Sequence, residues 1–150
     1  MPKAAIVESQ DTALVDEVHL DDLVDAINAQ RRQGAWCADA ASTLREDPRL
    51  TEAARSHVLW MTDHDDYAHI TRGNPDGDTP TARARAMGAK ASVAENIAWG
   101  QRSPEGAVAW WRDSKRHCAV LMDPTATQLG VAVEPDPHTA GWVWVMMTGR

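Results

Sequence analysis

The last third of the chain carries the pattern that most restricts the fold. Two short runs rich in β-branched and aromatic residues, 129–133 and 142–146, follow a longer stretch in which apolar residues recur at helical spacing. The segment 135–137 (Pro-Asp-Pro) and Gly141 lie between the two runs and favour a hairpin with a long loop. Because the helical patterns come first and the strands later, we expect an α+β fold. Its expected form is a three-layer α-β-α sandwich around a mostly antiparallel sheet.

Two helical stripes precede these strands. The first predicts a helix over about residues 20–32, with aspartates near its start and arginines near its end, as the helix dipole favours. The second predicts a helix with Thr51 as candidate N-cap. Its apolar stripe runs over three turns and consists of Leu50, Ala53, Ala54, His57, Val58 and Met61.

Shorter elements fill the middle of the chain. A strong turn cluster at 73–77 is followed by Pro80, which predicts a short helix that stops at Gly88. Residues 92–99 can form a strand. Ser103 then reads as the cap of a helix that continues to about Asp113.

The size and charge of the chain exclude several classes of protein. Its 150 residues suit one domain over 18–150 with an N-terminal arm or lead-in over 1–17. No stretch approaches the ~20 apolar residues of a membrane-spanning helix. The net charge of −7 repels phosphate backbones, so nucleic acid is not an expected partner. The first residues lack the basic stretch and apolar core of a signal peptide, so either none exists or the chain is a mature portion.

The two cysteines, Cys37 and Cys118, stand far apart in the sequence. They are either two unrelated buried thiols or a disulfide between the first loop and a later His-Cys segment. Two cysteines without a CxxC motif cannot form a four-thiolate zinc site. The residues alone leave the two alternatives open.

Four of the six histidines have sequence contexts that indicate structural or surface roles. His57 lies on the buried stripe of the second helix and is predicted to be a hydrogen-bonded core residue. His64 lies among aspartates at the end of that helix, which indicates a solvated cap that could hold a cation weakly. His19 and His138 have no companions in sequence and are predicted to be surface residues.

His69, Glu95 and His117 have a more informative context. His69 lies on a turn-bounded loop, and His117 follows a helix that contains two tryptophans. Glu95 lies in a mostly apolar strand and must face solvent, a cleft or a partner, because burying a carboxylate unpaired is costly. Two imidazoles and a carboxylate could bind Zn²⁺ with an open position for water, or could form an acid/base set.

At this point the chain resembles the CAP superfamily, whose domain is also called the SCP domain. Three motifs are the most specific. Tyr67-Ala68-His69 is similar to the family's aromatic-small-His turn, and Glu95-Asn96-Ile97-Ala98 to its Gly-Glu-Asn-Ile-Ala signature, with Ala94 in place of the glycine. Residues 111–122 resemble the bacterial block around His-Cys, with Lys115-Arg116 in place of Pro-Gly. Further matching stretches, in family order and covering about residues 20–149, are 28–32, 48–57, 76–77, 83–88, 130–133 and 142–149.

The resemblance implies a cleft above the sheet that in many members holds two histidines and two acidic residues and can bind a divalent metal. His69, Glu95 and His117 match three of the four positions. Ser114 stands at the fourth. A metal such as zinc would therefore rest on His69 and His117, with Glu95 holding a water or an imidazole.

The resemblance also favours a Cys37–Cys118 bridge, because bacterial members with a cysteine after this histidine commonly have another after the first helix. The bridge would pin the loop that bears His117 to the first helix. It implies a secreted or periplasmic protein.

The residues and the resemblance are compatible with three functions. The first is a monomeric binding module for a lipid, a small molecule or an envelope or host component, with metal-assisted contacts. The second is a hydrolase that uses a metal-bound or Glu95-activated water, with His69 and His117 in the site. The third is a scaffold with a vestigial cleft.

The chain has seven tryptophans. Four lie in motif or strand positions and are predicted to fill the core: Trp99, Trp111, Trp142 and Trp144. Trp36, Trp60 and Trp110 are the candidates for exposure. If two of these three share a face with apolar neighbours, that face becomes a candidate ligand or partner site.

Overall fold

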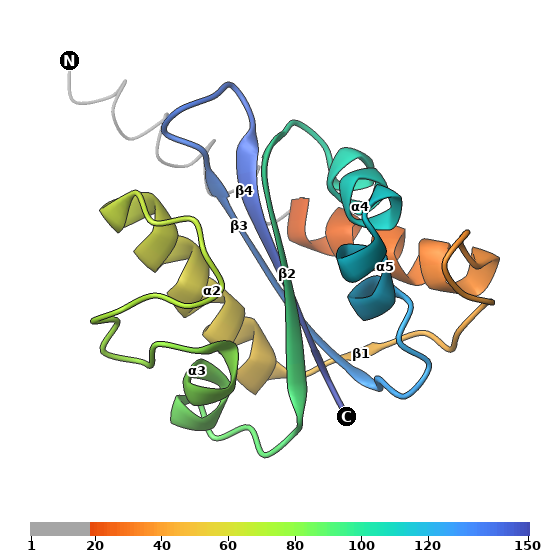
Figure 1. Ribbon diagram of the computed structural model, residues 1–150, viewed down its shortest axis with the longest axis horizontal. Coiled ribbons are helices and arrows are strands. Elements are labelled where there is room, and N and C mark those ends of the chain that lie inside the picture. The colour runs from red at the N-terminus through yellow and green to blue at the C-terminus, as the bar shows by residue number, and fades with distance from the viewer. Residues whose placement is uncertain (1–18) are drawn as a thin grey trace, which may run out of the picture.

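The computed structural model describes residues 19–150, and its centre is a four-stranded sheet with the order β1-β3-β4-β2 (Figure 1). The two long pairings are antiparallel, β3 with β4 and β4 with β2, whereas the short edge strand β1 is parallel to β3. The strands are β1 (Arg45–Glu46), β2 (Val93–Gln101), β3 (Gln128–Pro135) and β4 (Trp142–Gly149). The predicted hairpin and the mostly antiparallel sheet are confirmed.

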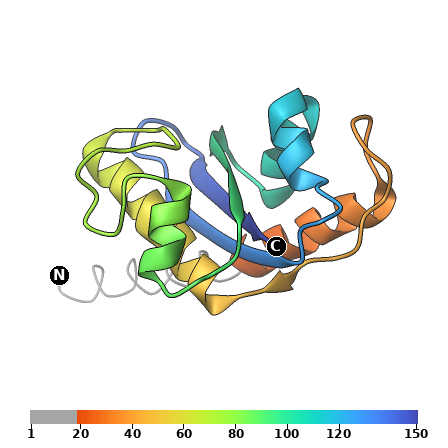
Figure 2. The ribbon, with the colours of Figure 1, turned by 60° about the horizontal axis from the view of Figure 1, so that its bottom comes forward.

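Helices cover both faces of this sheet, which makes the three layers of the predicted sandwich (Figures 1 and 2). One face carries α2 (Pro48–His64) and α3 (Pro80–Ala86). The other carries a helix that includes residues 19–33, together with α4 (Pro104–Asp113) and α5 (Lys115–Leu121). The α+β fold class is therefore confirmed. The predicted lead-in over 1–17 lies outside the described residues.

Strand β4 supplies a core to each face of the sheet. Val143 and Val145 pack with α2, whereas Trp144 and Met146 pack with the helices of the other layer. Because both faces are covered, the strand is an almost continuous apolar run in place of an apolar/polar alternation. No helix of residues 19–150 has the length and apolarity needed to cross a bilayer.

The second helix begins one turn earlier than predicted. Asp47 is the N-cap, and its side chain accepts a hydrogen bond from the Arg49 N–H. Pro48 follows at the first helical position, where its missing N–H costs nothing. Thr51, the predicted cap, therefore lies inside the helix. The apolar stripe itself is buried as predicted.

The tryptophans divide differently from the prediction. Trp111 and Trp144 are fully buried and Trp142 is partly buried, but Trp99 is 50% exposed, so its predicted core position is wrong. Trp99 lies near the end of edge strand β2, where its contact is the ring of Tyr67. Of the exposure candidates, Trp36 and Trp110 are exposed and Trp60 is partly buried.

Gly130 sets the distance between α2 and the sheet. A Cβ at this position would overlap the carbonyl group of Leu50 and the backbone nitrogen of Thr51. Only a residue without a side chain allows the backbone of α2 to lie directly on β3.

We predict that Gly130→Ala lowers the free energy of unfolding by about 3 kcal/mol, because backbone cannot give way as a side chain can. Urea denaturation checks this. The control is Gly106→Ala in α4, whose new methyl group would meet Ser103 Oγ at 3.1 Å. It should change stability by less than about 1 kcal/mol. Equal effects of the two substitutions would contradict the close approach of α2.

Candidate functional site

Glu95 is a buried carboxylate on β2, only 7% exposed, and three side chains surround it. Its Oε2 accepts a hydrogen bond from Arg83 Nη2 at 3.3 Å. Its Oε1 lies 3.0 Å from Nδ1 of His69 and 3.5 Å from Nε2 of His57. The sequence predicted that this carboxylate faces solvent, a cleft or a partner. In the structure both of its oxygens have partners, Arg83 for Oε2 and His69 for Oε1.

Arg83 is the partner that the sequence interpretation missed. It lies on α3, is fully buried, and also donates to the carbonyls of His69 and Gly77 and to Thr71 Oγ1. One guanidinium thus holds the carboxylate of Glu95 and the loop that carries His69. The sequence carries only a weak sign of this role. Arg83 stands between Ala82 and Ala84 in a short helix, and its side chain lies on the buried face of that helix together with Ala84.

His69 links this buried group to the surface, since its side chain is 48% exposed. A carboxylate can only accept, so Nδ1 of His69 donates to Glu95 and Nε2 carries the lone pair. Glu95 therefore fixes both the orientation and the tautomer of His69.

His117 approaches from the other layer. It lies on α5, and its carbonyl accepts a hydrogen bond of 2.9 Å from the Asn96 amide on β2. Its ring Nδ1 is buried and has no hydrogen-bond partner among the described residues. Burial, and then the neighbouring His69 and Arg116 side chains, lower the pKa of His117. The ring is therefore neutral at neutral pH and free to bind a ligand.

The three predicted residues line one pocket of about 430 Å³. Its full lining is His69, Pro80, Ala94, Glu95, Asn96, Ser114, Arg116, His117 and Val120. Asp113 is not part of it, because its side chain is 73% exposed and pairs with Arg112. Within residues 19–150 no group of three or more His, Cys, Asp or Glu side chains is arranged to hold a metal ion. The pocket thus offers two imidazoles, with a carboxylate behind one of them.

The other histidines have more contacts than the sequence indicated. His138 is exposed as predicted, and its Nε2 lies 2.6 Å from Asp65 Oδ1. His19 is partly buried, and its ring contacts that of Trp142. His64 is exposed and stacks on Trp60. His57 is fully buried as predicted, beside the carboxylate of Glu95, but among the described residues neither of its ring nitrogens has the predicted hydrogen-bond partner.

Burial lowers the pKa of His57 to about 4. The unfolded chain therefore binds a proton between about pH 6.5 and pH 4 that the folded chain does not. The free energy of unfolding should fall as the pH drops through this window, by roughly 3 kcal/mol in full. Urea denaturation across this range measures the loss.

His57→Met should lose markedly less stability over the same range, because it removes the titrating ring. His64→Gln, which alters an exposed ring on the same helix, should behave like the wild type. If His57→Met showed the full wild-type loss, the origin of the acid sensitivity would lie elsewhere.

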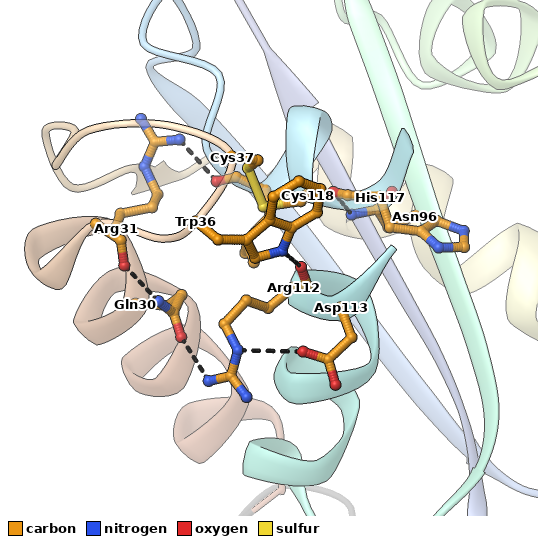
Figure 3. The surroundings of a disulfide bond; sticks show 11 residues. Gln30, Arg31, Trp36, Cys37, Asn96, Arg112, Asp113, His117 and Cys118 are labelled. Carbon is orange, nitrogen blue, oxygen red and sulfur yellow. Dashed lines mark hydrogen bonds and ion pairs between the residues drawn. A yellow bond between two sulfur atoms is a disulfide. The ribbon is translucent and has the colours of Figure 1, made fainter. Parts of the chain in front are cut away.

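Cys37 and Cys118 form a disulfide across 81 positions of the sequence, which confirms the predicted bridge (Figure 3). The neighbouring Trp36 donates its indole N–H to the carbonyl of Arg112 at 2.6 Å. The guanidinium of Arg112 donates to Gln30 Oε1 on the first helix. The loop after the first helix is therefore tied to α4 and to α5, one residue from His117.

We predict that Cys37→Ser/Cys118→Ser lowers the free energy of unfolding by about 4–5 kcal/mol, since the bridge closes a long loop. Urea denaturation should give the same loss for the wild type in dithiothreitol. The reductant should leave the double variant unchanged, which is the control. Two free thiols in the purified native protein, detected by mass spectrometry after alkylation, would contradict the bridge.

The chain thus combines an α-β-α sandwich, a disulfide between its first loop and α5, and a His/Glu pocket at the edge of the sheet. Residues 24–148 match the model of the cysteine-rich secretory protein family (CAP), so the chain belongs to this family. The resemblance inferred from its motifs is confirmed.

Individual relatives agree with this assignment. The chain is 29% identical over 110 residues to the protein named "Uncharacterized protein YkwD" of Bacillus subtilis (strain 168), an alignment that covers 73% of the chain and 40% of that protein. An extracellular protein with an SCP domain from Bacillus anthracis aligns with a TM-score of 0.77 at 20% identity, over 94% of this chain and 43% of that one. An outer surface protein of Borrelia burgdorferi aligns with a TM-score of 0.69 at 17% identity, over 85% and 89%. The chain thus spans less than half the length of the two Bacillus proteins, and the structural likenesses show the fold.

Proposed function

We propose that this chain is a secreted or periplasmic CAP domain whose pocket binds a ligand with the help of a divalent metal ion such as zinc. The observation that carries the proposal is the 3.0 Å contact between Nδ1 of His69 and Oε1 of Glu95. Histidines that bind metals usually donate their other ring N–H to a carboxylate, which fixes the ring and raises its basicity. His69 has this arrangement, with Nε2 left as the donor atom.

His117 supplies the second imidazole. Metal ions bind the neutral form of histidine, and the lowered pKa of His117 keeps the ring neutral. Two imidazoles leave coordination positions for oxygen atoms of a ligand or of water. The metal would polarise such an oxygen, while Ser114 and Arg116 on the same pocket wall are available to contact the rest of the ligand.

The geometry favours binding over hydrolysis. A hydrolase that used Glu95 to activate water would need this carboxylate free to take a proton, but Arg83 and His69 already engage its two oxygens. In this arrangement Glu95 positions an imidazole. The chain also lacks the Gly-x-Ser-x-Gly and His-Glu-x-x-His motifs of common hydrolases.

The disulfide supports the proposed location, because such bonds persist in oxidising compartments outside the cytoplasm. The names of the two similar solved structures, an extracellular protein and an outer surface protein, point the same way. A lipid, a small molecule or a component of an envelope or of a host is accordingly the expected kind of ligand. We expect a monomer.

We predict that the wild type takes up one zinc ion in isothermal titration at pH 7.5. His69→Ala and His117→Ala should each weaken this binding by about a hundredfold, because each removes one of two ligating rings. Glu95→Gln should weaken it by roughly tenfold or more, as the loss of a carboxylate behind a metal-binding histidine does.

The matched control is His64→Ala, which removes an exposed histidine on α2 that does not line the pocket. It should bind zinc as the wild type does. Equal stoichiometry and affinity in all of these proteins would remove the metal site from the proposal.

A further inference from the structure

A second pocket lies at the free edge of β2, away from the histidines. It measures about 200 Å³ and is lined by Trp99, Gln101 and Trp110. Trp99 and Trp110 are 50% and 55% exposed. Trp110 was predicted to be a candidate for exposure and Trp99 was not. Trp99 comes from β2 and Trp110 from α4.

A β-bulge creates this arrangement. Trp99 pairs with Val143 and Gln101 with Trp142, so Gly100 is an extra residue, and it has a positive φ of 93°. Opposite residues of an antiparallel pair share a face, and Val143 and Trp142 point to opposite faces. The bulge therefore turns Gln101 toward the layer of α4 while Trp99 stays on the face of α2. Bulges that re-aim a side chain in this way are common beside functional sites.

The ring of Trp99 is held in place although half of it is exposed. Tyr67 stacks on it with ring centroids 5.4 Å apart and planes inclined by 22°. The Tyr67 hydroxyl in turn donates to Oδ1 of Asp136, a buried carboxylate in the β3–β4 loop. One face of the indole thus rests on a fixed support, which prepares the remaining surface for a flat ligand at little entropic cost.

Gln101 adds an amide oxygen that has no partner within residues 19–150. Its backbone carbonyl accepts the Trp144 indole N–H, so the main chain is fixed. Its side-chain Oε1 is buried and, among the residues that the structure describes, has no hydrogen-bond partner. A buried acceptor without a partner costs free energy until a donor reaches it.

We propose that this pocket binds a neutral saccharide. A pyranose ring presents a face of C–H groups, which suits the electron-rich face of an indole, and a rim of hydroxyls, which can donate to the Gln101 amide. No charged side chain of the described residues lines the pocket, so the pocket offers no ion pair to a charged ligand. Uncharged sugar residues combine an apolar face with hydroxyl donors and need no ion pair.

The test uses the oxidised full chain and three probes, the tetrasaccharides of β-1,4-linked glucose, N-acetylglucosamine and mannose, in isothermal titration and saturation-transfer NMR. At least one should bind saturably. Trp99→Ala and Trp110→Ala should each weaken this binding roughly tenfold, the loss of one aromatic contact. Gln101→Leu, which keeps the size of the side chain but removes the amide, should weaken it as well.

Two control variants test whether the saccharide binds at this pocket. Trp36→Ala removes an exposed indole that does not line the pocket and should leave saccharide binding unchanged. His69→Ala should also bind normally, since the saccharide site does not depend on the proposed metal site. No binding of any tetrasaccharide, or an equal loss in Trp36→Ala, would overturn the proposal. Binding of a proline decamer in place of the saccharides would replace it with peptide recognition.

Discussion

The ion pair between Arg83 and Glu95 is the interaction on which the α3 side of the molecule depends. Both side chains are almost wholly buried, and removing two charges from water costs several kcal/mol for each ion. Neither charge is tolerable without the other. Arg83 also donates hydrogen bonds to the carbonyls of His69 and Gly77. The ion pair therefore fixes the path of the irregular loop between α2 and α3.

The opposite wall of the histidine pocket is fixed by a different kind of chemistry. His117 is held through its covalently bridged neighbour Cys118 and through the hydrogen bond from Asn96 to its carbonyl. Asn96 is adjacent in β2 to Glu95, and the two side chains serve opposite faces of the sheet. Two consecutive residues of one strand therefore position one imidazole on each side of β2, His69 from the loop before α3 and His117 from α5, and the pocket forms at this edge of the sheet.

Much of the architecture could be predicted from periodicity. The stripe of α2 and the apolar runs of β3 and β4 are strong local signals, since each is long enough to show its repeat. The two-residue strand β1 shows none. Helix α5 was missed for a related reason. It follows α4 directly, and only the extended backbone at Ser114 divides the two helices.

The candidate site was less accessible to sequence reasoning. His69, Glu95 and His117 could be brought together only through the resemblance to a family, because they lie far apart in the chain. The contacts of Arg83 and His57 with Glu95 were not predicted even with the resemblance. The sequence does not show which arginine is buried or which core histidine lies beside a carboxylate. The predicted core position of Trp99 was wrong for a different reason. Strand alternation does place its side chain on the α2 face, but the aromatic ring that packs on it there is that of Tyr67, and half of the residue stays exposed.

Strand β2 is an edge of the sheet, and an open edge is a template on which other chains can add strands and aggregate. Here side chains engage part of that edge. Trp111 from α4 donates its indole N–H to the carbonyl of Ile97 at 3.1 Å, and it does so while fully buried. A residue that packs the core thus also blocks one position of a β-ladder, and the helix that carries it shields the sheet from self-association.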